Sequence, residues 1–392
     1  MHIQEADKKY IASTYNRFPV TIVSGYGSIA VDENGKKYID MGSGIGVTSF
    51  GYCDKIWQDA ITEQIHLVQH TSNLYYTEPC TKLAALLVEK TGMSKVFFSN
   101  SGAEANECAI KAARKYASEK KGKDCYNIVT LYNGFHGRTL TTLAATGQDH
   151  YHELFQPLTT GFKHVHVGDV NELKSVAEPN TTAAIMIECI QGEGGVNVVP
   201  QDYVRTIADY CQTNDILLIV DEVQAGNGRT GEFYSYMNYG IKPDIVSTAK
   251  GLAGGLPMGA TILGEKVKDV FSFGDHGSTF GGNPVAAAAA VSIVKRIDSK
   301  LLSDVKAKGQ FVKDFFNGNP DIEQISGMGL MVGIKPRNKT AAEVVKQCMQ
   351  NGVLCLTAKD KVRLLPALNI PFDTLKEALN IIKASLYNSK TL

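Results

Sequence analysis

Two short apolar runs, each ending at one charged residue, constrain the fold of this chain most. Residues 216–220 (ILLIV) are followed by Asp221, and residues 244–249 (DIVSTA) lead to Lys250. Each run predicts a buried strand, and glycines follow both charges. Because ligands lie at the carboxyl ends of strands in open α/β sheets, we expect Asp221 and Lys250 to form two halves of one site.

This pair of side chains suits pyridoxal phosphate, whose aldehyde condenses with a lysine and whose protonated ring nitrogen needs an anionic partner. Other interpretations exist. A strand ending in Asp-Glu resembles the acidic strand of a phosphate-binding ATPase, and a lysine after Ala249 can be an ordinary solvated side chain. The sequence lacks G-x-x-x-x-G-K-[ST], which argues against the ATPase, and lacks H-E-x-x-H and G-x-S-x-G, which argues against zinc and serine hydrolases.

Predicted strands and helices alternate from about residue 95 to 265, a pattern typical of a mainly parallel sheet with helices on both faces. The 392 residues allow this large α/β domain and a smaller one. We expect residues 1–50, with a hairpin, to join the small domain, 51–285 to form the large domain and 286–392 to complete the small one. In the last part we predict a strand over 325–334 and a final helix opened by a capping box of Thr374 and Glu377.

A tight glycine turn joins a predicted strand at 95–100 to a long helix. Ser101 and Glu104 form a capping-box pattern at its start, and the first backbone N–H groups, at Gly102 and Ala103, make an anion site there. The plainer alternative is a capped helix without a ligand.

The strand predicted at 127–132 leads into Phe135, His136 and Arg138. An aromatic ring past a strand end can stack on a planar cofactor, and an arginine can bind a carboxylate with two hydrogen bonds. Core packing of Phe135 and a surface ion pair of Arg138 are the alternatives. We expect His136 to be a hydrogen-bonded loop residue.

Four further polar residues are candidates for ligand contacts. Glu193 lies in a glycine-rich loop after a strand, and Ser278 and Thr279 lie in another such loop. Arg363 lies within a short apolar strand, where an unpaired charge is costly, so we expect it to have an anionic partner.

Charge and cysteine content argue against several other classes of protein. Forty basic and 40 acidic residues balance, and no basic run is interleaved with aromatics, so nucleic acid is not an expected partner. The eight cysteines form no C-x-x-C pair, which argues against a disulfide framework or a zinc ribbon, and no metal is expected. The first residues lack an apolar signal-peptide core and no run is long enough to span a membrane, so we expect a cytoplasmic protein without membrane contact.

The ordered motifs resemble those of class III aminotransferases, a family of fold-type I pyridoxal phosphate enzymes, and within it most closely acetylornithine aminotransferases. They are NSGAEANE (100–107), FHGRT (135–139), QGEGG (191–195), DEVQ (221–224), TAK (248–250) and GGNP (281–284). The resemblance covers nearly the whole chain. It implies a large domain with a mainly parallel sheet flanked by helices, a smaller α/β domain, and a homodimer with shared active sites.

The resemblance also implies roles for residues. Lys250 would hold the cofactor covalently and later move a proton, and Asp221 would keep the ring nitrogen protonated. Phe135 would stack on one face of the ring, with Val223 and Gln224 beside the ring and its phenolic oxygen. The implied cofactor-binding set is Ser101, Gly102, Ala103, Phe135, Asp221, Glu222, Val223, Gln224, Lys250 and, from the neighbouring subunit, Thr279.

Substrate binding is implied for Arg138, Glu193, Ser278 and Arg363. Arg138 would bind a substrate carboxylate, and Arg363 would bind the carboxylate of the 2-oxo acid, with Glu193 pairing it while the amine donor is bound. The implied reaction moves the δ-amino group of N-acetylornithine to 2-oxoglutarate. Alternative donors are succinyl-diaminopimelate, free ornithine and 4-aminobutyrate; the small residues 42–46, where ornithine aminotransferases carry a tyrosine, favour an acylated amino group.

Overall fold

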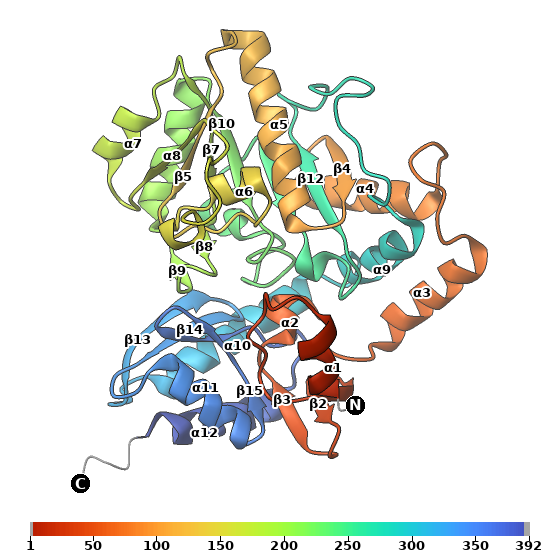
Figure 1. Cartoon of the computed structure of the whole chain (residues 1–392), viewed down its shortest axis with the longest axis vertical. Coiled ribbons are helices and arrows are strands. Elements are labelled where there is room, and N and C mark those ends of the chain that lie inside the picture. The colour runs from red at the N-terminus through yellow and green to blue at the C-terminus, as the bar shows by residue number, and fades with distance from the viewer. Residues whose placement is uncertain (1–2, 388–392) are drawn as a thin grey trace.

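A seven-stranded sheet lies at the centre of the upper part of the molecule (Figure 1). The computed structural model describes residues 3–387. The strand order is β4-β12-β11-β10-β7-β5-β6, and β12 alone runs antiparallel to its neighbours. The predicted α/β class with a mainly parallel sheet is confirmed. The strands are β4 (Lys95–Ser99), β5 (Asn127–Leu131), β6 (Phe162–Val165), β7 (Thr182–Ile187), β10 (Leu217–Asp221), β11 (Ile245–Thr248) and β12 (Gly259–Leu263).

Helices cover both faces of this sheet, which explains why its central strands are apolar along their whole length. In β10, Leu217 and Ile219 pack in a cluster that includes side chains of α5, whereas Leu218 and Val220 pack in a second cluster with α4 and α8. The helices of this part are α3 (Lys55–Leu67), α4 (Glu78–Thr91), α5 (Gly102–Lys121), α6 (Leu140–Ala145), α7 (Val170–Val176), α8 (Gln201–Thr213) and α9 (Pro284–Val294).

Two four-stranded sheets form a second region, seen below the central sheet in Figure 1. One has the order β1-β2-β3-β15 and the other β13-β14-β17-β16. The pairing of β15 with β3 joins the C-terminal part of the chain to its first strands. The elements are β1 (Ile22–Tyr26), β2 (Ile29–Asp32), β3 (Lys37–Asp40), α10 (Ser299–Phe316), β13 (Ile322–Met328), β14 (Met331–Pro336), α11 (Ala341–Gln350), β15 (Val353–Leu354), β16 (Leu356–Ala358), β17 (Lys361–Leu364) and α12 (Phe372–Leu386).

The division into domains at residues 51 and 286 remains a proposal. The β3–β15 pairing supports its grouping of the first strands with the C-terminal part. The short elements between are α2 (Ser43–Gly46), η1 (Asp149–Tyr151), β8 (Ile190–Gln191), β9 (Asn197–Val198), η2 (Ser235–Tyr239) and η3 (Lys250–Leu252).

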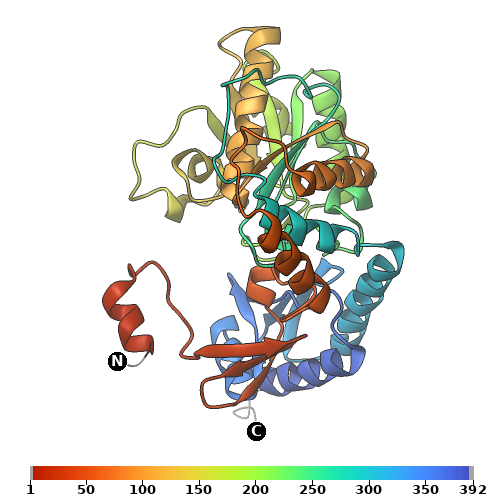
Figure 2. The ribbon, with the colours of Figure 1, turned by 90° about the vertical axis from the view of Figure 1, so that its right-hand side faces the viewer.

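The first helix, α1 (Ile3–Tyr10), stands away from the rest of the molecule (Figure 2) and has no buried residue. Within residues 3–387, no helix combines the length and the apolar character needed to cross a membrane.

Two local predictions in the C-terminal part are wrong. The single strand expected over 325–334 is an antiparallel hairpin of β13 and β14, because Gly329 turns the chain with φ +55°, where a side chain would also collide with backbone atoms of Thr230. The final helix starts at Phe372, before Thr374, and Pro371 is its N-cap without a side-chain hydrogen bond. Thr374 and Glu377 therefore lie inside the helix and form no capping box.

Candidate active site

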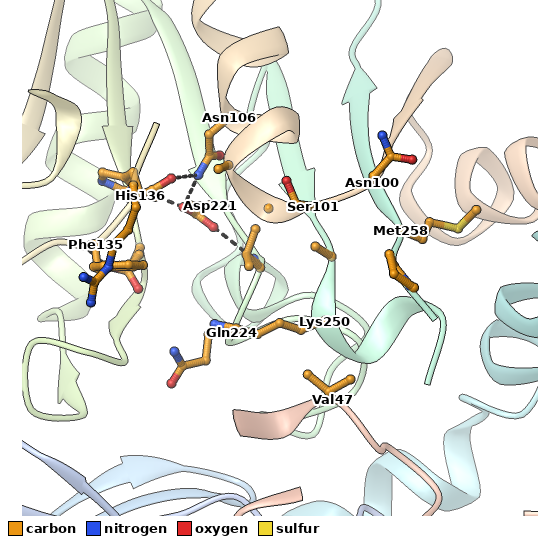
Figure 3. Close-up of a pocket in the computed structure, with 18 of the residues that line it drawn as sticks. Val47, Asn100, Ser101, Asn106, Phe135, His136, Asp221, Gln224, Lys250 and Met258 are labelled. Carbon is orange, nitrogen blue, oxygen red and sulfur yellow. Dashed lines mark hydrogen bonds and ion pairs between the residues drawn. The ribbon is translucent and has the colours of Figure 1, made fainter. Parts of the chain in front are cut away.

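A cavity of about 450 Å³ opens at the carboxyl ends of β10 and β11 (Figure 3). Its wall also includes the start of α5 and the loop after β5. Most of the residues predicted for one site line it: Ser101, Gly102, Ala103, Phe135, Arg138, Asp221, Val223, Gln224 and Lys250. The structure therefore brings together the two charges that the strand ends singled out.

Lys250 lies just beyond β11. In the parallel pairing of β10 with β11, Asp221 is opposite Ser247, so both charges leave the sheet at the same edge. The backbone of Lys250 has φ +47°, which is uncommon for a residue with a side chain. Burial lowers the pKa of the Lys250 amine, while the charge of Glu193 acts in the opposite direction. A lowered pKa makes the amine more readily available in its uncharged, nucleophilic form.

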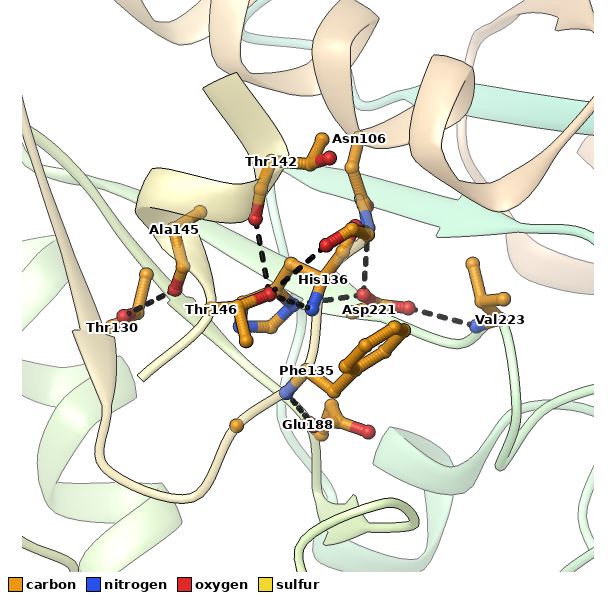
Figure 4. A network of polar contacts seen from close by, with 12 residues as sticks. Asn106, Thr130, Phe135, His136, Thr142, Ala145, Thr146, Glu188, Asp221 and Val223 are labelled. Carbon is orange, nitrogen blue, oxygen red and sulfur yellow. Dashed lines mark hydrogen bonds and ion pairs between the residues drawn. The ribbon is translucent and has the colours of Figure 1, made fainter. Parts of the chain in front are cut away.

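Three donors from different parts of the chain hold the Asp221 carboxylate (Figure 4). Oδ2 accepts hydrogen bonds from Asn106 Nδ2 and from His136 Nδ1, each at 2.8 Å. Oδ1 accepts the N–H of Val223 at 3.0 Å. Asp221 is only 3% exposed, so this carboxylate is fixed in place before any cationic group binds it.

His136 belongs to the site, although the sequence predicted an ordinary loop residue. Its ring is buried and donates to Asp221. Burial alone would lower the pKa of His136, but the hydrogen bond and charge of Asp221, with the charge of Glu188, raise it above its ordinary value. The sequence signal that was available is its position between Phe135 and Arg138. Asn106, on α5, lies within the NSGAEANE motif, but its position inside a helix did not indicate that it reaches Asp221.

Glu188 is a second buried carboxylate of this cavity that the prediction omitted. It directly follows β7, the neighbour of β10, so the rule that selected Asp221 also selects it. Its Oε2 accepts the N–H of Phe135 at 2.8 Å and its Oε1 that of Gly192 at 3.3 Å. Burial raises the pKa of Glu188 above its ordinary value.

The start of α5 forms one end of the cavity. Ser101 caps the helix by accepting the N–H of Glu104, as the sequence predicted. In the described part of the chain, the N–H groups of Gly102 and Ala103 have no acceptor, so with the helix dipole they offer an anion site. A Cβ at Gly102 would lie 2.7 Å from Val223 Cγ1, which explains the need for glycine here.

Arg363 has the anionic partner that the sequence required. From β17, its Nη1 donates to Glu193 Oε1 at 2.6 Å and to Gln224 Oε1 at 2.9 Å. Burial alone would raise the pKa of Glu193, but the charge and hydrogen bond of Arg363 lower it. Gln224 lines the cavity, so this ion pair lies directly beside it.

Arg138 lies at the rim and is exposed. Its guanidinium carbon is 4.6 Å from the centre of the Tyr151 ring and 5.8 Å from that of Phe135. It forms no hydrogen bond or ion pair with residues 3–387, so the surface ion pair considered from the sequence is absent from this part of the chain.

Besides Glu193 and Arg363, which lie beside the cavity, three further predicted residues do not line it. Glu222 is buried on the opposite side of the chain from Asp221, because successive side chains of an extended segment alternate, and it binds Ser235 and the N–H of Tyr236. Burial raises its pKa to about 7. Ser278 lies close by, since its Oγ accepts from Asn100 of the cavity wall at 3.1 Å. Thr279 is exposed, and its contact with a neighbouring subunit remains a prediction.

These groups fit pyridoxal phosphate on chemical grounds. Unpaired helix N–H groups suit its phosphate, a fixed carboxylate suits its ring nitrogen, and an amine of lowered pKa suits its aldehyde. Among residues 3–387, no three His, Cys, Asp or Glu side chains gather in a way that could hold a metal ion.

Comparison with known proteins gives the family. A profile for aminotransferase class-III matches residues 10–386. The chain belongs to the class III aminotransferases. An acetylornithine aminotransferase from Haemophilus ducreyi is 47% identical over 381 residues, covering 97% of both chains.

Solved structures of this class have the same fold. An ornithine aminotransferase from Toxoplasma gondii, with pyridoxal phosphate at partial occupancy in its active site, is 31% identical, with a TM-score of 0.92 over 98% of this chain and 93% of that one. An N-acetylornithine aminotransferase from Stenotrophomonas maltophilia is 31% identical, with a TM-score of 0.84 over 97% of each chain.

Family membership confirms three of the predictions. The fold is that of the class III aminotransferases, the cofactor is pyridoxal phosphate, and the chain is a transferase that uses a small-molecule amino donor and an oxo acid. The roles of individual residues are proposals, developed below.

Proposed function

We propose that this class III aminotransferase moves the δ-amino group of N2-acetyl-L-ornithine to 2-oxoglutarate, giving N-acetyl-L-glutamate 5-semialdehyde and L-glutamate. The reaction belongs to arginine biosynthesis and takes place in the cytoplasm. The relatives named acetylornithine aminotransferase support this substrate. The observation that carries the proposal is the arrangement of charges, with a paired Arg363 beside the cavity and an unpaired Arg138 at its rim.

One part of the cavity, formed by Gly102, Ala103 and Asp221 and called its floor below, would hold the cofactor. When bound, pyridoxal phosphate supplies an aldehyde for the amino group and a ring that accepts electrons from the substrate carbon. The N–H groups of Gly102 and Ala103 bind the phosphate. Asp221, fixed by Asn106 and His136, keeps a proton on the ring nitrogen.

The side walls of the cavity position the ring and move the proton. Phe135 and Val223 line the cavity and would exclude water from the bound ring. Lys250 Nζ removes a proton from Cδ of the donor, and its lowered pKa, which results from burial, favours the uncharged amine that can act as a base.

The Glu193–Arg363 pair lets one site accept two different substrates. The reacting carbon of acetylornithine carries no carboxylate, so Glu193 stays on Arg363 and covers its charge. Glutamate and 2-oxoglutarate carry a carboxylate at the reacting carbon, which replaces Glu193 on Arg363. Replacing one carboxylate by another leaves no buried charge unpaired, so the exchange is not costly. Because both substrates use one site in turn, the kinetics are ping-pong.

Arg138 binds the carboxylate that lies far from the reacting carbon. In the donor this is the α-carboxylate of acetylornithine, and in the acceptor it is the second carboxylate of 2-oxoglutarate. An arginine without a protein anion is suited to this task, because it can form two hydrogen bonds with a carboxylate.

The part of the cavity wall at Val47 supports a donor with an acylated amino group. The segment 42–47 contributes Val47 to the cavity (Figure 3), where a free α-amino group would need a polar partner. The apolar side chain of Val47 suits the methyl group of an acetyl group.

The proposed enzyme is a homodimer with shared sites. Two loops lie against each other through Asn73, whose side chain donates to Ser278 O and Gly281 O. They carry large exposed apolar side chains, a feature that supports an interface with a second copy: Leu74, Tyr75, Tyr76, Phe273 and Phe280. Thr279 lies in the second of these loops and would contact the cofactor phosphate of the partner.

A donor panel tests this function. We expect kcat/KM with 2-oxoglutarate to be highest for N-acetylornithine, then succinyl-diaminopimelate, and about 100-fold lower for free ornithine and 4-aminobutyrate. Equal or better turnover of free ornithine would overturn the choice of substrate while leaving the family unchanged.

A further inference from the structure

Two aromatic rings lie against the Arg138 guanidinium, which forms no hydrogen bond or ion pair within residues 3–387. The closer is Tyr151, with 4.6 Å between guanidinium carbon and ring centre. A free arginine side chain rotates about several bonds, and its ordering opposes binding. A ring face that contacts the guanidinium restricts this freedom and leaves the N–H groups at the edge of the plane free to bind a carboxylate.

Tyr151 is itself firmly placed. It ends η1 (Asp149–Tyr151), and its ring lies edge-on to Phe135 at 5.9 Å and against His150 at 3.9 Å. Just before it, Gln148 Nε2 donates to Gly134 O at 3.1 Å, which ties this turn to the loop that carries Arg138. No sequence motif singled out Tyr151, because its partner lies on a different turn of the chain.

We propose that Tyr151 is a positioning residue for substrate: its ring orients Arg138 to bind the carboxylate distant from the reacting carbon. This inference rests on the proposed role of Arg138. The ring face, and not the hydroxyl group, carries the effect, because the contact with Arg138 is made to the ring.

The test compares a matched pair of donors in the full-length holoenzyme. N-acetylornithine carries the carboxylate, and N-acetyl-1,4-diaminobutane is the same molecule without it. In Tyr151→Leu we expect KM for N-acetylornithine to rise about tenfold with kcat within about twofold of wild type, and kcat/KM for the decarboxylated donor to stay unchanged. Tyr151→Phe, which keeps the ring, should behave as wild type.

Binding without turnover gives a second readout. N-acetyl-L-norvaline has the carboxylate and acetyl group but no δ-amino group, and its dissociation constant can be measured from the change in cofactor absorbance. Tyr151→Leu should raise this dissociation constant about tenfold, and Tyr151→Phe should leave it unchanged. In an Arg138→Gln background the Leu substitution should have no further effect, because the group it orients is gone.

Phe155→Leu is the control, since Phe155 is an exposed ring of the same loop and is not one of the rings that contact Arg138 among the described residues. Equal losses for both donors in Tyr151→Leu, or a Tyr151→Phe as impaired as Tyr151→Leu, would overturn the proposal. If the donor panel favours another ω-amino acid, that donor and its decarboxylated analogue replace the pair, so failure of the proposed substrate is distinguished from failure of the role of Tyr151.

Discussion

The floor and the rim of the cavity are built differently. At the floor, Asp221 is buried and receives three hydrogen bonds from protein donors. At the rim, Arg138 is exposed and rests on ring faces, and beside the cavity Arg363 is paired with a carboxylate that a substrate can replace. The contrast suggests that the cofactor groups are fixed in advance, whereas the substrate groups are kept available for two different ligands in turn.

The largest expected effect comes from removing the Lys250 amine, which belongs to the cofactor groups. Lys250→Ala removes the amine that attaches the cofactor and moves the proton, so we expect kcat to fall at least about 10⁴-fold for every donor. The variant should lose the yellow colour of the covalently attached cofactor and keep the circular-dichroism spectrum of the wild type. Residual turnover within tenfold of wild type would show that another group performs the chemistry.

Removing Arg363 from its ion pair with Glu193 should affect glutamate and not N-acetylornithine. In Arg363→Gln we expect kcat/KM for glutamate to fall about 100-fold, because its α-carboxylate loses a charged partner, while that for N-acetylornithine changes by less than about fivefold. The two half-reactions are measured separately from cofactor absorbance. Lys359→Gln, an exposed charge in the turn between β16 and β17, is the control. Equal losses in both half-reactions would refute the substrate switch.

A substitution of His136, which holds Asp221, should affect the reaction with all substrates alike. His136→Asn removes the buried ring from Asp221 and should weaken cofactor binding about tenfold, with the ratio of kcat/KM between glutamate and N-acetylornithine unchanged. The measurement is the equilibrium dissociation of pyridoxal phosphate after loading. A changed substrate ratio would mean that His136 acts on the rim as well.

The smallest predicted effect is a shift with pH. Burial lowers the pKa of Lys250, and the charge of Glu193 counteracts this shift. Glu193→Gln removes that charge while the charge of Arg363, which lowers the pKa of Lys250, stays, so the pKa of Lys250 should fall further. The rate at which apoprotein attaches the cofactor rises with pH as the amine loses its proton, so its midpoint should move to lower pH in Glu193→Gln. A midpoint that stays in place or moves to higher pH would contradict this coupling.

The sequence predicted the parts of the site that follow from strand ends and glycine turns. Asp221 and Lys250 were found because a lone charge after an apolar strand has few structural explanations. Glu188 satisfies the same rule but was not assigned to the site. Glu222 was misplaced because a motif shows which residues are adjacent and not which side each faces, and alternation turns it into the core.

Other contacts could not be predicted because they join distant segments. Asn106 and His136 meet Asp221 only when α5 and the loop after β5 lie over the end of β10. Tyr151 meets Arg138 through a turn without a sequence motif. Within the C-terminal part, a local pattern failed for a different reason: α12 begins at Phe372, directly after the N-cap Pro371, which is earlier than the Thr374 pattern indicated.

One measurement tests the central claim most directly, namely that a single cavity holds both the cofactor groups and the donor site. Wild-type enzyme loaded with pyridoxal phosphate is mixed with N-acetylornithine in the absence of any oxo acid, and the aldehyde product is counted. We predict one equivalent of N-acetylglutamate 5-semialdehyde per bound cofactor in a single burst, and further product only after 2-oxoglutarate is added. An intact, loaded protein that releases no aldehyde until the acceptor is present would contradict the account.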